Sequence, residues 1–64
     1  MRHPLLRVVL ADDSVLFRQM VALVLREAGM SVVAEAGDVP TLTKAVAERV
    51  PDVVVVDVRM PPDY

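Results

Sequence analysis

The run Asp52–Val58 holds four consecutive valines, and it constrains the fold of this 64-residue chain more than any other sequence feature. Valine is stiff about χ1 and fits a pleated strand. An apolar run without alternation is typical of a strand that is buried on both faces. Two further valine-containing runs precede it, Leu5–Ala11 and Ser31–Ala36. The three runs predict three strands of a parallel sheet.

The segment between the first two runs predicts a helix over residues 14–28. Apolar side chains recur there at i, i+4, i+7, i+8 and i+11. The buried stripe predicted by this spacing consists of Phe17, Val21, Val24, Leu25 and Ala28. Other apolar positions widen the stripe, so the side chains expected to face water are mainly Arg18, Gln19, Ala22, Arg26 and Glu27. Asp13 or Ser14 supplies the N-terminal cap, and Gly29 ends the helix.

A second helix is expected from Val39 or Pro40 to Val50, where Pro51 ends it. Asp38 or Val39 lies near its cap. Its predicted buried stripe is Leu42, Val46 and Val50. Strands that alternate with helices of this length favour right-handed crossovers. The sequence therefore predicts an α/β fold with helices on both faces of the sheet.

Composition excludes several classes of function. The net charge is −2 and the seven Lys and Arg residues are scattered singly, which disfavours nucleic-acid binding. Cysteine is absent, so the chain has neither a disulfide nor a zinc thiolate site. The two glycines form no phosphate-binding loop. Uncharged runs of about seven residues are too short to span a bilayer, and no signal peptide is recognisable, so we expect a cytoplasmic protein without membrane contact.

Three aspartates follow the ends of two expected strands. Asp12 and Asp13 come directly after the first strand, and Asp57 comes directly after the four valines. Ligands of parallel α/β sheets bind outside the carboxyl ends of the strands, so these carboxylates should meet if the two strands are neighbours. Like charges so close either hold a divalent cation or keep some carboxyls protonated. Ligand sets made of oxygen alone favour Mg²⁺, and a carboxylate beside that ion is a known kind of nucleophile toward phosphoryl groups.

A structural interpretation of these aspartates stays open. Aspartate is favoured at helix caps, so Asp12 and Asp13 could belong to a cap and a solvated loop. Asp57 is harder to explain in this way, because an acid directly after four valines is poor strand material and is costly to desolvate. Met60–Pro62 marks a turn beyond it.

The segments VVLADDS, VVAEAGD and PDVVVVDVRMP together resemble the first half of the receiver domain of two-component response regulators. The DD-x-x-x-x-R opening and the VVAEAGD stretch are most similar to the NarL/FixJ group, whose members usually carry a LuxR-type helix-turn-helix after the receiver. The resemblance implies the strand-helix-strand-helix-strand portion of a flavodoxin-like (CheY-like) doubly wound receiver fold. Residues 1–64 are then expected to form a truncated receiver domain without a DNA-binding domain.

The resemblance also implies a phosphoacceptor module of a phosphorelay and no enzyme. Asp57 matches the residue that accepts a phosphoryl group from the phosphohistidine of a sensor histidine kinase. Asp12, Asp13 and Asp57, with the backbone carbonyl of Arg59, match the set that binds Mg²⁺. Such a receiver normally controls a transcription-regulating output domain, which is not present in these 64 residues.

Two other functions fit parts of the sequence. The switch Ser/Thr of a fourth strand and the Lys of a fifth are missing, which favours an interaction or oligomerisation fragment without phosphorylation. A phosphatase of the haloacid dehalogenase type is disfavoured, because it needs D-x-D where the chain has Asp12-Asp13-Ser14 and Asp57-Val58-Arg59. Since the third strand would form an open edge, we expect a homo-oligomer through that edge or through the apolar face of the first helix.

Overall fold

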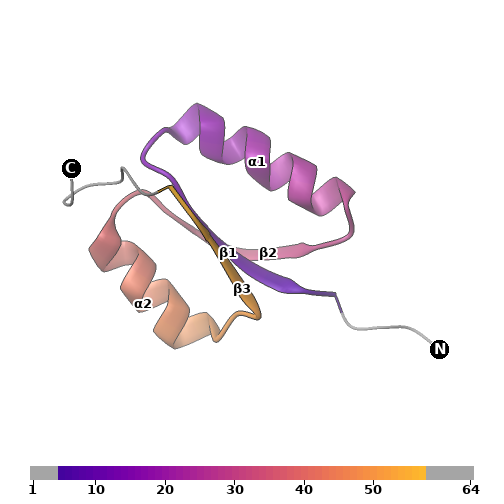
Figure 1. The fold of residues 1–64 in the computed structure, drawn as a ribbon. Coiled ribbons are helices and arrows are strands. Elements are labelled where there is room, and N and C mark those ends of the chain that lie inside the picture. The colour runs from indigo at the N-terminus through magenta and orange to yellow at the C-terminus, as the bar shows by residue number, and fades with distance from the viewer. Residues whose placement is uncertain (1–4, 58–64) are drawn as a thin grey trace.

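The computed structural model describes residues 5–57, and Figure 1 shows their arrangement. The elements follow in the order β1 (Arg7–Ala11), α1 (Val15–Glu27), β2 (Ser31–Ala36), α2 (Val39–Arg49) and β3 (Val53–Val56). The strands pair in parallel in the order β2-β1-β3. In Figure 1 the helices α1 and α2 lie on opposite sides of this sheet. The predicted α/β fold is therefore confirmed, and its central strand is β1, which is the arrangement of a partial CheY-like receiver.

The pairing of β1 with β2 contains one irregularity. Val8 pairs with Val32, but Val9 pairs with Ala34, so that β2 holds one additional residue, Val33. Beyond this shift Leu10 pairs with Glu35 and Ala11 pairs with Ala36. Because paired residues of neighbouring strands point to the same face, Glu35 lies on the face of Leu10, and Ala36 lies on the face of Ala11.

The core is centred on β1, the middle strand. Val8 and Val9 are fully buried, and Leu10 and Ala11 are nearly so. On the α2 side, Ala11 and Ala36 pack against Val39 and Leu42. The core therefore surrounds the strand whose C-terminal end carries Asp12 and Asp13.

Strands β1 and β3 are shorter than predicted. β1 begins at Arg7 instead of Leu5. β3 begins at Val53 instead of Asp52, and Asp52 forms two hydrogen bonds with Arg7 at the start of β1. The Asp52 carboxylate accepts the Arg7 N–H at 2.8 Å, and the Asp52 N–H donates to the Arg7 carbonyl at 2.8 Å. Val58, the last residue of the predicted run, lies outside the described residues.

The expectation that the four valines are buried on both faces is wrong. Their exposed fractions range from 37% at Val55 to 43% at Val56. Within residues 5–57, β3 pairs with β1 alone, and both helices contact β1 and β2. The valines are exposed because neither helix covers this edge of the sheet.

The ends of α1 agree with prediction. Of the two candidate caps, the structure selects Ser14, whose hydroxyl accepts the Phe17 N–H at 3.2 Å. The helix ends at Glu27, and Gly29 takes the left-handed conformation with φ of 89°. Glycine adopts this conformation without steric cost, which explains the stop.

The orientation of α1 differs from the prediction. Ala22, expected to face water, is buried, and Arg18 is half-buried. Phe17 and Val24, expected to be buried, are 55% and 65% exposed. Val21 and Leu25 of the predicted stripe are half-buried, so the face of α1 that contacts β1 and β2 is rotated toward Ala22 and Arg18 and away from Val24.

Helix α2 begins at a cap formed by Asp38, whose carboxylate accepts the Thr41 N–H at 2.8 Å. This backbone hydrogen bond, together with a side-chain hydrogen bond to Thr41, lowers the pKa of Asp38 below its ordinary value of 3.8. The predicted burial of Val50 is wrong. That residue follows the last helical residue, is 71% exposed and takes a left-handed φ of 46°.

Candidate functional site

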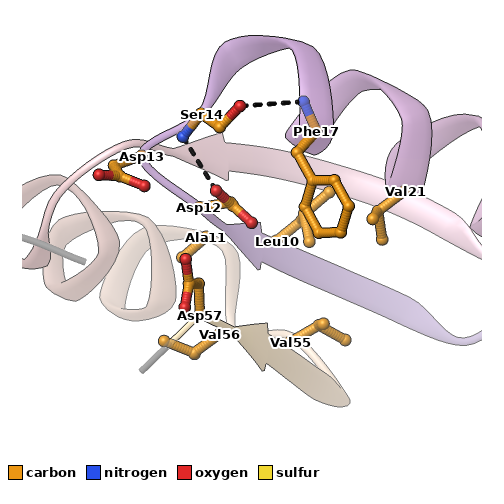
Figure 2. A pocket seen from close by; sticks show the side chains of 10 residues that line it. All are labelled: Leu10, Ala11, Asp12, Asp13, Ser14, Phe17, Val21, Val55, Val56 and Asp57. Atoms are coloured by element: carbon orange, nitrogen blue, oxygen red, sulfur yellow. Dashed lines mark hydrogen bonds between the residues drawn. The ribbon is translucent and has the colours of Figure 1, made fainter. Parts of the chain in front are cut away.

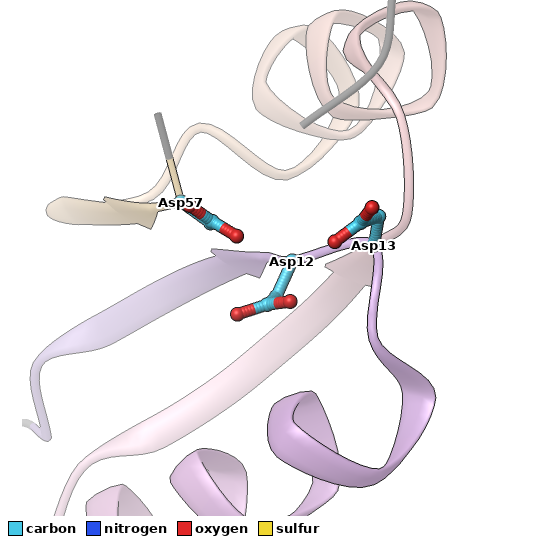
Figure 3. Close-up of side chains that lie close together, drawn as sticks. All are labelled: Asp12, Asp13 and Asp57. Atoms are coloured by element: carbon cyan, nitrogen blue, oxygen red, sulfur yellow. The ribbon is translucent and has the colours of Figure 1, made fainter. Parts of the chain in front are cut away.

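The carboxylates of Asp12, Asp13 and Asp57 converge at the C-terminal edge of the sheet, as predicted from their positions after β1 and β3 (Figure 3). One carboxylate oxygen from each residue can be chosen so that all three lie within 4.8 Å of one another. Asp12 is buried, Asp57 is half-buried and Asp13 is exposed. The cluster therefore runs from the protein interior to its surface.

Main-chain hydrogen bonds fix the backbone at this edge. The Asp57 N–H donates to the Ala11 carbonyl at 2.9 Å, and the Asp12 N–H donates to the Ala36 carbonyl at 3.0 Å. Both bonds extend the parallel ladders one residue beyond the strands. The acidic side chains thus leave the sheet from backbone that is already ordered.

Asp12 is held through three of its groups. Besides its N–H, its carboxylate oxygen Oδ1 accepts the Ser14 N–H at 2.9 Å, which Figure 2 shows. Its backbone carbonyl accepts a hydrogen bond from Arg18 Nη1 at 2.7 Å. The structural interpretation of Asp12 is therefore correct in part, because this residue does stabilise the start of the loop before α1.

A pocket of about 500 Å³ opens beside the cluster (Figure 2). Asp12, Asp13 and Asp57 form its acidic end, and Ser14 lies next to them. Its apolar wall combines side chains of the sheet and of α1: Leu10, Ala11, Phe17, Val21, Val55 and Val56. A small anionic group with a bound cation can approach the carboxylates from this open side.

Arg18 is the site residue that the residue pattern alone did not reveal. It was expected to face water, but its side chain is only 18% exposed and contacts both the Asp12 carbonyl and Glu35. The available signal was the DD-x-x-x-x-R spacing, which puts an arginine in the second turn of a helix that begins beside the acidic pair. Arg59 and the Met60–Pro62 turn lie outside the described residues.

Residues 8–63 match the profile of the response regulator receiver domain. The chain belongs to this family. The fold and the position of the aspartate cluster in this receiver agree with that assignment.

Curated relatives that match this receiver have names that describe different outputs. A protein-glutamate methylesterase/protein-glutamine glutaminase of Haloarcula marismortui is 46% identical over 55 residues, which cover 86% of the receiver and 15% of the relative. The transcriptional regulatory protein PdtaR of Mycobacterium tuberculosis is 42% identical over 55 residues, 86% of the receiver and 27% of the relative. The receiver thus spans about a quarter or less of these relatives. Their names do not support the NarL/FixJ assignment.

The donor set of this receiver fits Mg²⁺. All three side chains offer carboxylate oxygens, the hard ligands that this ion prefers, and their spacing allows them to share one ion. Within residues 5–57, no helix combines the length and the apolar character needed to cross a bilayer.

Proposed function

We propose that this receiver accepts a phosphoryl group on Asp57 from a sensor histidine kinase, with Mg²⁺ held by Asp12, Asp13 and Asp57. The observation that supports this function most directly is the convergence of the three carboxylates within 4.8 Å at an open pocket. The backbone carbonyl of Arg59 is the fourth ligand in this proposal. Its inclusion rests on the resemblance of the sequence to receiver domains.

The proposed reaction is a displacement at phosphorus. A carboxylate oxygen of Asp57 forms the new O–P bond while the P–N bond to the donor histidine breaks, and the electron pair returns to the imidazole. When bound, Mg²⁺ neutralises the charge of the phosphoryl oxygens beside the carboxylates. Asp12 keeps its place through the hydrogen bonds described above, so the receiver contributes position and charge.

The kinase side of the proposal concerns α1. Leu16, Phe17 and Met20 are each at least 55% exposed, and Phe17 also lines the pocket. A phosphohistidine that enters the pocket brings its own helix against these side chains. We place the docking of the kinase there because the same face leads to Asp57.

We further propose that residues 1–64 act as the N-terminal part of a receiver, in the cytoplasm and without catalytic activity or nucleic-acid contact of their own. The PdtaR name supports an output in transcription regulation. The methylesterase activity named for other relatives is not carried over, because the chain covers 15% of the first of them.

One observation favours a second function, an oligomerisation module without phosphorylation. The four valines of β3 are exposed, and such a strand edge can pair with a second copy of the chain. Under this alternative the aspartate cluster has no chemical role.

Phosphoramidate, a small donor with a P–N bond, separates the two functions. The parent chain in Mg²⁺ is expected to gain the mass of one phosphoryl group, and the Asp57→Asn variant is expected to gain none. Asp52→Asn is the matched control, because Asp52 lies at the opposite end of β3 and outside the cluster. Absence of the gain in the parent, or an equal gain in Asp57→Asn, contradicts the phosphoacceptor function.

A further inference from the structure

Arg18 connects three separate parts of the receiver. Its side chain starts in the second turn of α1, donates from Nη1 to the Asp12 carbonyl at 2.7 Å and donates from Nε to Glu35 at 3.2 Å. Asp12 follows β1 and Glu35 lies near the end of β2. The guanidinium therefore joins the loop that carries both acidic residues to the neighbouring strand.

Glu35 contacts two arginines of α1, Arg18 closely and the more exposed Arg26 at a longer distance. Arg18 Nε contacts Oε1 of Glu35 at 3.2 Å, and Arg26 Nη2 contacts Oε2 at 3.8 Å. The Arg18 side chain is 18% exposed, whereas that of Arg26 is 53% exposed. A planar guanidinium bonded at two of its nitrogens has its orientation fixed, so Glu35 determines where Arg18 presents Nη1.

Gly37 leaves the space that this arrangement requires. A Cβ atom at Gly37 would lie 3.1 Å from Arg18 Nη1, which is closer than most such contacts in proteins. Nη1 is already bonded to the Asp12 carbonyl at 2.7 Å, so it cannot retreat without weakening that bond. The absence of a side chain at Gly37 thus leaves room for the hydrogen bond between Arg18 Nη1 and the Asp12 carbonyl.

We infer that Arg18 is a positioning residue that fixes the Asp12–Asp13 loop for Mg²⁺ through its hydrogen bond to the Asp12 carbonyl. The inference rests on the proposed function, because it concerns the ion of the same site. Arg18 is not itself a proposed ligand of the ion, but it donates a hydrogen bond to Asp12, which is one. Loss of such an outer partner typically weakens metal binding by about 10- to 100-fold. Removing the guanidinium also leaves a part-buried carbonyl without this donor.

The test compares Arg18→Met with Arg26→Met. Both variants remove an arginine of α1 that contacts Glu35, but only Arg18 contacts Asp12. Mg²⁺ affinity is measured by titration of the backbone amide resonances. Arg18→Met is expected to bind about tenfold more weakly than the parent, and Arg26→Met is expected to bind like the parent. Equal affinities of the two variants would overturn the inference, whatever their melting temperatures.

Gly37→Ala provides a second approach that keeps both arginines. It is expected to weaken Mg²⁺ binding in the parent and to have no effect in the Arg18→Met background, because both changes act through one hydrogen bond. Additive effects in this cycle would contradict the inference. Arg18→Lys, which retains a donor and a charge, is expected to recover part of the affinity, and it serves together with Gly37→Ala if Arg18→Met does not fold.

The two proposals can fail separately. If the parent binds Mg²⁺ and is phosphorylated on Asp57 while Arg18→Met behaves as Arg26→Met does, only the role of Arg18 is wrong. If the parent binds no Mg²⁺, the proposed function fails and the role of Arg18 fails with it.

Discussion

The backbone N–H of Asp57 lies 2.9 Å from the backbone carbonyl of Ala11 and donates a hydrogen bond to it. Ala11 directly precedes Asp12, so the main chain sets the separation between the phosphoacceptor candidate and the acidic pair. Substitutions that keep the shape of these side chains therefore change the charge of the cluster and leave the backbone in place. This makes asparagine variants informative about chemistry.

Asp13→Asn is expected to stabilise the receiver when Mg²⁺ is absent. It removes one of three like charges within 4.8 Å, and two charges about 4 Å apart in water repel by about 1 kcal/mol. The free energy of unfolding in urea at low ionic strength should rise by about that amount. Saturating Mg²⁺ should reverse the order, because a ligand stabilises the form that binds it more tightly. Glu48→Gln, on the exposed side of α2, is the control, and an equal response of Asp13→Asn and the parent to Mg²⁺ would contradict the prediction.

Val50→Gly is expected to raise the free energy of unfolding by about 1 kcal/mol, because a left-handed residue with a side chain costs about 1–2 kcal/mol. Val50 has a φ of 46° and its side chain is 71% exposed, so little packing is lost. Its carbonyl still accepts the bond from Arg7 Nη1. Thermal unfolding measures the change. Gly29→Ala, at φ of 89°, should lower stability by a similar amount, and a fall in stability of Val50→Gly would show that the valine side chain contributes more than its exposure indicates.

The cap of α2 is expected to make stability depend on pH. The Thr41 N–H lowers the pKa of Asp38 in the folded state below 3.8, and burial opposes this only as the smallest cause. The contribution of the carboxylate is thus fully present above the unfolded pKa, and it is lost as the pH falls through the folded pKa. Urea unfolding across the acidic range should show that the deficit of Asp38→Ala shrinks toward low pH. Asp38→Asn keeps a capping oxygen that does not titrate, so a pH profile identical to that of the parent would exclude this role for the charge.

The 64-residue chain is expected to sediment as a dimer or a larger species at tens of micromolar. Within residues 5–57 the outer edge of β3 pairs with no other strand, and natural edges are often protected by lysine. Val54→Lys should therefore shift the chain toward the monomer. Leu16→Lys, on the exposed face of α1, tests the alternative contact. A parent chain that sediments as a monomer would remove the basis for the oligomerisation module.

The aspartate cluster was predictable because its geometry follows from topology. Asp12 and Asp57 end neighbouring parallel strands, and parallel strands bring their carboxyl ends to one edge. The side of α1 that faces the sheet was not predictable from periodicity. A wide apolar stripe can be rotated about the helix axis, and contacts with β1 and β2 decided that Ala22 is buried and that Phe17 lies, partly exposed, at the wall of the pocket.

The predictions for Arg18 and Val50 were wrong because tertiary contacts and the turn after α2, which periodicity does not show, set the positions of these side chains. An arginine on a helix is normally expected to face solvent. Only the pairing of Glu35 with Leu10 shows that a carboxylate lies on the face of the sheet that α1 covers, within reach of Arg18. Val50 fits the apolar spacing of α2, but the chain must turn there to enter β3. The backbone conformation of that turn moves the side chain away from the helix stripe.

Val33, the additional residue in the pairing of β2 with β1, determines which face Glu35 occupies. If Val33 instead paired with Val9 in a regular ladder, Glu35 would pair with Ala11 and point toward Val39 and Leu42, and the partner of Arg18 would be lost from the α1 face. The register of β2 against β1 is therefore constrained more strictly than the composition of β2. In recombination or loop grafting between receivers, this strand should tolerate the loss of its additional residue, which leaves Glu35 opposite Leu10, better than any exchange that moves Glu35 opposite Ala11.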